Sequence, residues 1–470
     1  MTTRARDHDV DIVILGAGFA GLRAARALVK DFGDERVTAV EGDAHVGGRA
    51  RVSRACAPWD VNLGPEFAHG DRNSLLVEFL RARGIETTTR KWPDRYYFGH
   101  LGASFDASDA EAKCEDAREA RRAFDDLREV HRAFDDLEGV PRDRDVTARE
   151  WLTLIGATER VVELAETIYA NDFGASLSAL GMREIVEEKK RWRYGDKYLV
   201  LDRSMEDVAK ELARGVDVRT NWEIDCVDYS SPDRVVVTRK GSSETIVAKK
   251  CIVALPITAL RRGNATNCVT FIPSLPECKI AAAEAIQMGN AAKLFIGFSE
   301  IFWPEDVFDV ICTDCFFPEF WITKYAASSE PREAKSAEEA AAIAATVGVV
   351  TFFISGKFAD AIANVQESEL VNRAIDQLDT IFKVSCKERV TTKKIVNWAH
   401  ERFVQGAYTY PSPNVGASRE VLAAPVSNML FFAGEATHTG VNPCLHGAME
   451  TGERAARQAR EALFGGSIKL

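Results

Sequence analysis

The sequence predicts an α/β protein whose first domain is split over several segments and interrupted by an inserted α+β domain. Three patterns predict this organisation. A strand, a glycine-rich turn and a helix open the chain at 10–28, short alternating strands follow residue 216, and a second glycine-rich segment lies at 428–457. Because 470 residues are too many for one ordinary core, we expect two domains.

Composition narrows the class of protein. Hydrophobic residues make up 46% of the chain and charged residues 28%, which is typical of a soluble globular protein. No apolar run reaches the roughly 18 residues of a membrane span. The first strand begins by Asp9, which leaves no room for a signal peptide, so a cytoplasmic protein is expected. The net charge of −11 argues against general nucleic-acid binding and mildly favours cationic ligands.

The ten cysteines are scattered along the chain and are expected to be reduced thiols. Cys312 and Cys315 form a single CxxC pair. A structural zinc site needs four ligands, and neither a second CxxC nor a histidine pair lies nearby. We therefore expect incidental thiols and no metal site.

A charged segment from Arg118 to Leu137 has helical patterning, and RAFDDL occurs in it twice, at Arg122 and Arg132. The spacing leaves the second copy nearly a fifth of a turn out of register. This pattern predicts a solvated helix or helix pair and no solenoid. The other expected elements are a βαβ unit (11–15, 21–30, 37–41), a β-ribbon with turns at 230–233 and 240–243, a strand pair (292–298 with 347–354), and helices at 328–345 and 365–382.

The N-terminal turn contains GxGxxG, formed by Gly16, Gly18 and Gly21. The first glycine permits the tight turn, the second lets the backbone approach a pyrophosphate, and the third allows close helix–strand packing. Glu41 follows at the end of the next strand, where a carboxylate can bind ribose hydroxyls. Since strand, helix and acid are all in place, dinucleotide binding is favoured over an ordinary turn.

A second glycine pair follows the acid, with Gly47, Gly48 and Arg49 in succession. The glycines permit another close backbone approach, and the rigid guanidinium can hold a pyrophosphate or the flavin side of a cofactor. Taken alone, the same residues would be read as a surface turn with an exposed arginine.

Several segments together resemble the flavin-containing amine oxidases, a family that includes polyamine oxidases, monoamine oxidases and lysine-specific histone demethylases. The segments are GAGFAGLRAARAL, GGR, WDVNLGPEFAHG, FIPSLPECKIAAAEAIQMGNAAKLFIGFSEIFWP, NWAHERFVQGAYTYPSPN and FFAGEATH followed by HGAMETGERAA. The resemblance covers nearly the whole chain. It implies a Rossmann-type FAD-binding domain of the GR2-like kind at 1–98, 196–275 and 394–470, and a substrate-binding domain at 99–195 and 276–393.

The resemblance also implies how FAD is held. Glu435 would bind the ribityl chain, the backbone of Val227 would meet adenine, and Trp398 would pack beside the isoalloxazine. A C-terminal helix beginning near Leu445 would direct its positive dipole end at the flavin pyrimidine ring. The full set of expected cofactor contacts is Gly16, Gly18, Ala20, Gly21, Glu41, Gly48, Arg49, Gly64, Pro65, Glu66, Val227, Trp398, Gly434, Glu435, Cys444 and Leu445.

Four residues are expected in the chemical site. Lys293 lies in the apolar strand AAKLFIGF, where lysine is costly. The resemblance gives it a water-mediated hydrogen bond to flavin N5, and the alternative is a strand-edge lysine whose stem reaches solvent. His69 is either near the substrate or a buried histidine satisfied by backbone. Asp172, beside Asn171, is either an acidic substrate contact or part of a helix cap.

Two positions depart from parts of the family. Ala407 replaces the flavin-linking cysteine of monoamine oxidases, so noncovalent FAD is expected. Tyr408, the fourth expected site residue, supplies one ring of the family's aromatic cage, but Cys444 occupies the facing position. The cage is therefore incomplete or built differently, or Cys444 packs beneath the flavin.

These expectations lead to FAD-dependent oxidation of a polyamine of the spermine or spermidine type, with hydride transfer to flavin N5. The imine then hydrolyses to an aldehyde and an amine, and O2 is reduced to hydrogen peroxide. The alternatives are a histone-lysine demethylase-like enzyme, an L-amino-acid oxidase, a desaturase-type enzyme, and a flavin-containing binding protein without turnover. The C-terminal SIKL resembles a peroxisomal signal that Ile468 interrupts. Oligomeric state is not indicated.

Overall fold

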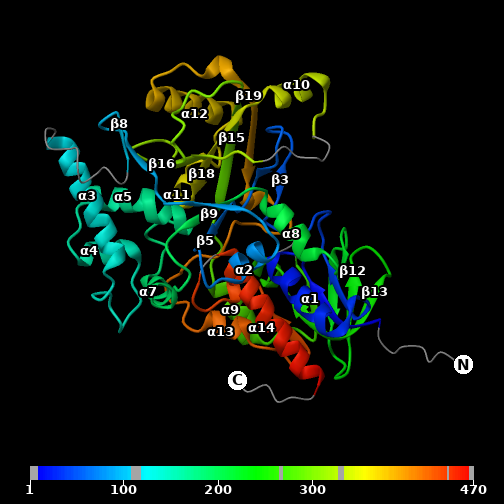
Figure 1. The fold of residues 1–470 in the computed structure, drawn as a ribbon. Coiled ribbons are helices and arrows are strands. Elements are labelled where there is room, and N and C mark those ends of the chain that lie inside the picture. The colour runs from blue at the N-terminus through cyan, green and yellow to red at the C-terminus, as the bar shows by residue number, and fades with distance from the viewer. Residues whose placement is uncertain (1–8, 107–117, 264–267, 326–332, 442–443, 465–470) are drawn as a thin grey trace, which may run out of the picture.

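Two large sheets organise the computed structural model, which describes residues 9–106, 118–263, 268–325, 333–441 and 444–464. Figure 1 shows the first sheet near α1 and α14, and the second near α10 and α12 at the opposite end of the molecule. The C-terminal SIKL segment lies outside the described residues. No helix in the described parts of the chain has the length and apolarity needed to cross a bilayer.

The first sheet has eight strands in the order β10-β2-β1-β13-β12-β11-β14, with β20 beside β13. Parallel pairing joins β10, β2, β1, β13 and β20. Every residue of β1 is buried, as expected for a strand covered on both faces, and its one charged residue, Asp11, pairs with Arg36 and Lys249. The strands are β1 Val10–Leu15, β2 Val37–Val40, β10 Asp217–Arg219, β11 Ile224–Asp228, β12 Val235–Arg239, β13 Thr245–Val253, β14 Thr270–Ile272 and β20 Leu430–Phe432.

Helices α1 (Phe19–Phe32), α2 (Leu75–Ala82), α8 (Met205–Ala213) and α14 (Leu445–Leu463) share one hydrophobic core with this sheet. A Cβ placed on Gly452 of α14 would lie 2.2 Å from the carbonyl oxygen of Ala20 in α1. A glycine is therefore required for the close approach of α14 to the cofactor-binding turn, and the predicted start of this helix near Leu445 is confirmed.

The second sheet has the order β19-β15-β18-β17-β16-β7-β8, antiparallel except between β16 and β7. The predicted strand pair is β15 with β18. Helix α12 (Glu367–Phe382) packs on the sheet, with α10 (Ala337–Ala345) nearby. The strands are β7 Arg95–Phe98, β8 Ala103–Asp106, β15 Ala291–Phe298, β16 Asp309–Thr313, β17 Glu319–Ile322, β18 Gly348–Ser355 and β19 Val390–Asn397. The expected domain boundaries at 98/99 and 393/394 both cut through this sheet.

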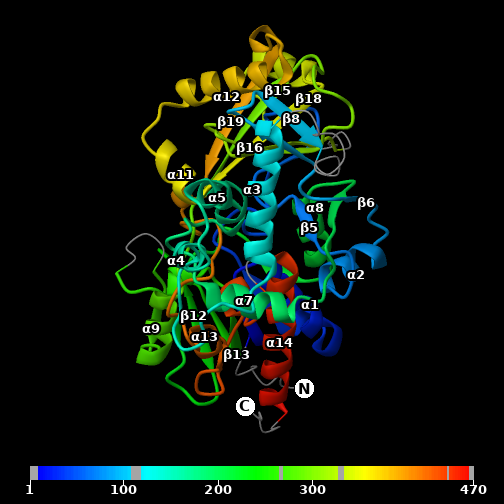
Figure 2. The ribbon, with the colours of Figure 1, turned by 90° about the vertical axis from the view of Figure 1, so that its left-hand side faces the viewer.

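A helical region lies beside the second sheet, with α3 upright along it in Figure 2. It contains α3 Arg118–Asp135, α4 Ala148–Leu154, α5 Glu159–Ala165, a π-helical turn Glu166–Ala170, α6 Asn171–Phe173 and α7 Met182–Arg191. The helix predicted at 118–137 is α3, whose charged side chains are mostly exposed while its apolar side chains are buried. Both RAFDDL copies bury their Ala-Phe pair, at Ala123 with Phe124 and at Ala133 with Phe134, in a core shared with α4 and α5.

Small elements complete the fold. Strands β5 (Phe67–His69), β9 (Tyr198–Leu201) and β6 (Thr87–Arg90) form a three-stranded sheet in which His69 lies opposite Tyr198. The remaining strands are β3 Val52–Ser53 and β4 Val61–Asn62, and the remaining α-helices are α9 Glu277–Ala285, α11 Gly356–Ile362 and α13 Ser418–Ala423. The helix expected at 328–345 begins only at Ala337 within the described residues. Cys312 and Cys315 are free thiols, and the described residues form no metal-ligand cluster.

Candidate active site

A cavity of about 850 Å3 is lined by residues from both sheets. The glycine-rich turn between β1 and α1 lines it on the side of the first sheet. Residues of β15, β17 and β18 line it on the side of the second, and β5, β9 and α6 contribute further walls. The expected site residues that line it are Gly16, Gly18, Ala20, Glu41, Gly48, Arg49, Gly64, Pro65, Glu66, His69, Asp172, Lys293, Trp398, Tyr408, Gly434, Glu435, Cys444 and Leu445.

The three motif glycines have three different surroundings. Gly16 has φ +96°, which favours glycine at the turn. A Cβ on Gly21 would lie 1.9 Å from the Gly16 carbonyl oxygen, so this residue sets the packing of helix on turn. No atom would lie within 4 Å of a Cβ on Gly18, because its α-carbon faces the open space of the cavity. The turn is therefore shaped to let a ligand approach its backbone.

Glu41 follows β2 at the mouth of the same turn. Its carboxylate accepts hydrogen bonds from the amides of Ala17 at 2.8 Å and Asp43 at 3.0 Å. Burial raises the pKa of Glu41, and these backbone donors oppose the increase. The side chain is thus held between two backbone segments at the place where ribose hydroxyls would be bound.

Arg49 joins two segments that are far apart in the sequence. One guanidinium nitrogen donates to the carbonyl of Ala407 at 2.7 Å and to Glu435 Oε1 at 3.0 Å. Glu435 is buried, and its other oxygen accepts from the Thr409 hydroxyl at 2.6 Å. The alternative of a surface turn with an exposed arginine is therefore wrong, since this guanidinium is fixed at the wall of the cavity.

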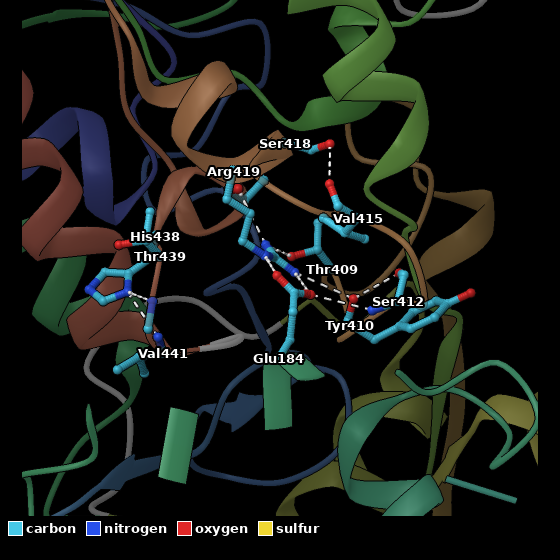
Figure 3. A network of polar contacts seen from close by, with 12 residues as sticks. Glu184, Thr409, Tyr410, Ser412, Val415, Ser418, Arg419, His438, Thr439 and Val441 are labelled. Carbon is cyan, nitrogen blue, oxygen red and sulfur yellow. Dashed lines mark hydrogen bonds and ion pairs between the residues drawn. The ribbon is translucent and has the colours of Figure 1, made fainter. Parts of the chain in front are cut away.

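Behind Glu435, a buried network ties the C-terminal motif to the helical region (Figure 3). Arg419 of α13 donates to the carboxylate of Glu184 in α7 at 2.6 Å and 3.2 Å, and to Thr409 Oγ1 at 3.1 Å. It also reaches the carbonyl of Ala436 at 3.3 Å. The arginine thereby braces the segments that carry Thr409 and Glu435. Nothing in the spacing of residues 184, 409 and 419 could have revealed this network.

We expect Arg419→Met to lower the free energy of unfolding by about 3 kcal/mol, because it leaves the mostly buried Glu184 without its cation. The measurement is the urea unfolding midpoint, followed together with FAD retention. Arg373→Met is the matched control, since Arg373 pairs with Glu369 on the exposed face of α12 and such pairs contribute little. Equal midpoints for the two variants would contradict this account.

The start of α14 completes the cofactor side of the cavity. Cys444 is the N-cap residue, its side chain makes no capping hydrogen bond, and Leu445 and Ala448 line the cavity. The positive end of a 19-residue helix favours a group that carries negative charge. These features fit FAD. Gly18 leaves room for the pyrophosphate, Glu41 lies where the ribose hydroxyls would bind, and the start of α14 suits the flavin ring.

Lys293 lies on β15, an interior strand of the second sheet between β18 and the edge strand β19. Its side chain is buried, and its Nζ donates to the carbonyl of Gly64 at 2.6 Å and to Glu66 Oε2 at 3.3 Å. Burial lowers the pKa of Lys293, and the Glu66 carboxylate opposes that decrease. The alternative of a strand-edge lysine that reaches solvent is wrong.

Glu66 was expected among the cofactor contacts, and the structure shows that it also anchors Lys293. Besides the lysine, its carboxylate accepts from Trp321 Nε1 at 2.7 Å, from Tyr325 Oη at 2.9 Å and from the Thr323 hydroxyl. Donors from Lys293, Trp321, Thr323 and Tyr325 thus converge on one buried carboxylate at the cavity wall.

His69 lines the cavity beside Tyr198, with ring centroids 4.5 Å apart. Desolvation lowers the pKa of His69 to about 4, so its imidazole is neutral at physiological pH. A neutral imidazole can accept a hydrogen bond from an amine without repelling it.

Asp172 also lines the cavity, within the short helix α6. Its backbone carbonyl accepts from the Tyr408 hydroxyl at 3.0 Å, and desolvation raises the pKa of its carboxyl to about 6. The helix-cap alternative does not apply to Asn171, whose amide instead donates to Glu319 at 3.1 Å and accepts from the Ser355 amide at 3.0 Å.

The raised pKa of Asp172 predicts a pH-dependent stability. A carboxyl whose folded pKa exceeds its unfolded value stabilises the fold below the unfolded value, near 4, and loses that contribution as pH rises through about 6. We therefore expect the melting temperature of the wild type to fall relative to Asp172→Asn over this range. Thermal melts of both proteins at several pH values provide the measurement, and parallel curves would contradict the assignment.

Two expectations for cofactor contacts need correction. Val227 does not line the cavity, because it is fully buried in β11 between β12 and β14. Glu223 and Ile224, at the start of that strand, line it instead. Gly21 does not line the cavity either and acts through packing. Cys444 does line it and packs against Tyr194 and Val441.

Sequence reasoning missed most of the walls on the side of the second sheet. The additional aromatic and acidic residues are Phe67, Trp92, Tyr169, Trp192, Tyr198, Glu319, Trp321 and Phe353. Alternation along EFWI was the available signal, because Glu319 and Trp321 face the cavity while Phe320 lies in the core. Aromatic residues from several elements thus line the cavity together with Tyr408 and Cys444.

Comparison with known proteins agrees with this geometry. A family model described as flavin containing amine oxidoreductase matches residues 19–460. Polyamine oxidase 3 of Oryza sativa subsp. japonica is 24% identical over 475 residues, which cover 97% of this chain and 90% of that protein. Lysine-specific histone demethylase 1B of Mus musculus is 23% identical over 462 residues, which cover 96% of this chain and 52% of that protein.

Among solved structures, cyclohexylamine oxidase from Brevibacterium oxydans IH-35A has the same fold. Its TM-score is 0.77 at 20% sequence identity, and the match covers 97% of this chain and 100% of that chain. The family model spans most of the chain, including nearly all of the residues that line the cavity. This protein therefore belongs to the flavin-containing amine oxidoreductase family, and FAD is its cofactor.

Proposed function

We propose that this protein oxidises a polyamine of the spermine or spermidine type, with noncovalently bound FAD and O2 as the final electron acceptor. The observation that carries the proposal is the set of side chains that line the cavity. Lys293 lies on one of its walls, and the carboxyl groups of Asp172 and Glu319 line it among aromatic rings. Carboxylates among apolar walls suit a substrate that alternates cationic nitrogens with methylene chains. The similarity to a plant polyamine oxidase supports the same substrate class.

The chain's residues would position the amine and control protons. FAD, when bound, supplies the two-electron acceptor. Lys293 Nζ, fixed by Gly64 and Glu66, would hold a water beside flavin N5. Neutral His69 would accept a hydrogen bond from the amine, which must lose its own proton before oxidation. Overall, the substrate gives up two electrons and two protons to O2, and water then cleaves the imine to an aldehyde and an amine.

We expect FAD to bind without a covalent link because Ala407 occupies the position of the flavin-linking cysteine of monoamine oxidases. Ala407 offers no side-chain nucleophile, and its carbonyl is occupied by Arg49. We therefore expect acid precipitation of the protein to release all of its flavin into the supernatant, where absorbance measures it. Flavin that stays with the precipitate would contradict noncovalent binding.

Anaerobic mixing tests the proposed reaction. A polyamine should bleach the oxidised flavin, and readmitted O2 should restore it with release of hydrogen peroxide. The panel should contain spermine, spermidine, a simple monoamine, a histone-tail peptide with methylated lysine, and L-amino acids. Bleaching by the amino acids or the peptide alone, or by no compound in the panel, would reject the proposal.

A further inference from the structure

A second cavity, of about 540 Å3, lies between α1, α14 and the segment that follows α8. It shares no lining residue with the active-site cavity. Of the side chains that line it, six are basic and two are acidic. The chain as a whole carries a net charge of −11, so the charge around this cavity is opposite in sign to that of the whole protein.

The basic side chains come from single faces of two neighbouring helices. Arg23, Arg26 and Lys30 recur at positions i, i+3 and i+7 and therefore share one face of α1. Arg457 and Arg460, three residues apart, share one face of α14. The two helices lie side by side (Figures 1 and 2), and alanines of both helices also line the cavity. Long basic side chains thus border a hollow that small side chains leave open.

The acidic residues of the lining neutralise only two of these cations. Arg23 pairs with Glu453 at 2.7 Å, and Arg460 pairs with Asp31 at 2.9 Å. These two ion pairs use both acids that line the cavity. Four basic residues of the lining therefore have no acidic partner inside it.

Those four cations differ in how they are held. Arg26 donates to the carbonyls of Glu211 at 3.3 Å and Arg214 at 3.1 Å, which fixes its guanidinium without neutralising it. Arg214 pairs with Glu211 at 2.7 Å, outside the lining. Within the described parts of the chain, Lys30 and Arg457 are exposed and form no ion pair or hydrogen bond through their side chains. Two side chains are thus free to meet a ligand, beside a guanidinium that is already in place.

Helix dipoles explain only part of this charge. Lys30 lies in the last turn of α1 and Arg460 in the last turn of α14, where the negative end of a helix stabilises a cation. This effect falls off within one turn, so it does not account for Arg23, Arg26 or Arg457. Like charges held around one cavity repel one another, and a bound anion would relieve that repulsion.

The geometry points to an anion with several phosphate groups. Planar guanidinium groups match phosphate oxygens in charge and in the spacing of their donors. The cavity volume lies within the range of about 300–1,000 Å3 that is usual for small-molecule sites, and its cations come from three separate segments. We propose that this cavity binds a chain of two or three phosphate groups, either free or attached to a nucleoside. The proposal goes beyond amine oxidation and does not depend on which amine is the substrate.

Binding there would join the helices that also form the cofactor side of the active site. Gly18 and Phe19 at the start of α1 and Leu445 at the start of α14 line the active-site cavity, whereas the basic cavity lies farther along both helices. An anion that contacts α1, α14 and the segment after α8 stabilises the folded protein, because the unfolded chain lacks the site. The melting temperature of the holoenzyme should therefore rise with ligand concentration.

Titration calorimetry of the holoenzyme tests the proposal. Bound FAD fills the glycine-rich turn with its own pyrophosphate, and flavin absorbance shows that FAD stays in place. The probes are tripolyphosphate, pyrophosphate, inorganic phosphate and ATP, in a metal-free buffer of low ionic strength. We expect one tripolyphosphate per chain with a Kd of about 10–100 μM, at least about 10-fold tighter than inorganic phosphate and weaker in added salt. Tripolyphosphate binding no tighter than about 1 mM, or no tighter than that of inorganic phosphate, would overturn the proposal.

Comparison of ATP with tripolyphosphate identifies the source of the phosphate chain. Tighter binding of ATP assigns the site to a nucleotide, whose base and ribose would then use the apolar part of the lining. Tighter binding of tripolyphosphate assigns it to a free phosphate chain.

Substitution of the two unpaired cations tests the location. Lys30→Ala and Arg457→Ala should each weaken tripolyphosphate binding by about 10-fold, as expected for one lost charged hydrogen bond. Because both side chains are exposed and unpaired, the melting temperature without ligand and the reduction of the flavin by amines should stay at wild-type values. Lys387→Ala is the matched control, since Lys387 is exposed just before β19 of the second sheet, and it should bind like the wild type. Wild-type affinity in both test variants, or an equal loss of affinity in Lys387→Ala, would show that this cavity is not the binding site.

Discussion

Replacing Gly21 by alanine is expected to abolish folding of the cofactor-binding turn and with it all FAD binding. A Cβ at this position would lie 1.9 Å from the Gly16 carbonyl oxygen and 3.3 Å from Ile14. Both neighbours belong to the buried β1 strand or its turn, so neither can move without displacing the first sheet. We expect destabilisation of more than about 4 kcal/mol, the range of severe steric defects in a core.

Gly18→Ala provides the contrast within the same motif. No atom lies within 4 Å of a Cβ at Gly18, so the apoprotein should melt within about 2 °C of wild-type apoprotein. Its methyl group would nevertheless occupy the space that the FAD pyrophosphate approaches, and flavin content should fall sharply. The measurements are flavin absorbance per protein and thermal melts of apoprotein. Equal melting temperatures for the Gly18→Ala and Gly21→Ala apoproteins would contradict the packing role of Gly21.

This contrast shows which parts of the site are readable from sequence. The roles of Gly16, Gly18 and Gly21 depend on a local turn, so spacing along the chain is enough to predict them. Glu41 was found for the same reason, since it ends the strand beside that turn. Arg49 needed the family resemblance, because its partners Ala407 and Glu435 lie more than 350 residues away.

The substrate side of the cavity could not be predicted in this way. Glu319 and Asp309 lie on the same face because β16 and β17 pair in one register, and a shift of one residue in that pairing would place the two side chains on opposite faces. Val227 was chosen as the adenine contact, but the strand enters the cavity wall at Glu223 and Ile224. Single-residue placement along a strand is set by tertiary contacts that local patterns do not contain.

The same reasoning explains the charged helix α3. Its composition suggested a solvated element, and most of its charges are indeed exposed. Alanine and phenylalanine at helical spacing nevertheless bury a continuous stripe, which includes Phe124 and Phe134. Average polarity over a segment therefore says less about burial than the spacing of its few apolar residues.

Lys293→Met is expected to slow turnover by on the order of 10²-fold, the usual effect of losing a positioned proton-handling group. Methionine has a similar length and stays apolar, so it fits the buried position on β15. Glu66 keeps Trp321, Thr323 and Tyr325 as donors, so its carboxylate remains satisfied. The fold and the FAD content should therefore survive. Stopped-flow absorbance, anaerobic for reduction by the amine and aerated for reoxidation by O2, locates the slowed half-reaction.

Lys324→Met is the control for the loss of a lysine as such, because Lys324 is exposed on the segment after β17. It should match the wild type in both half-reactions. The argument for Lys293 depends on where its Nζ is held: the Gly64 carbonyl and the Glu66 carboxylate fix it at the cavity wall, and burial weakens its hold on the proton. Methionine offers neither a hydrogen-bond donor nor a charge there. If both half-reactions proceed at wild-type rates in Lys293→Met, the lysine serves only to neutralise Glu66, and the water that assists the flavin must be held by other residues.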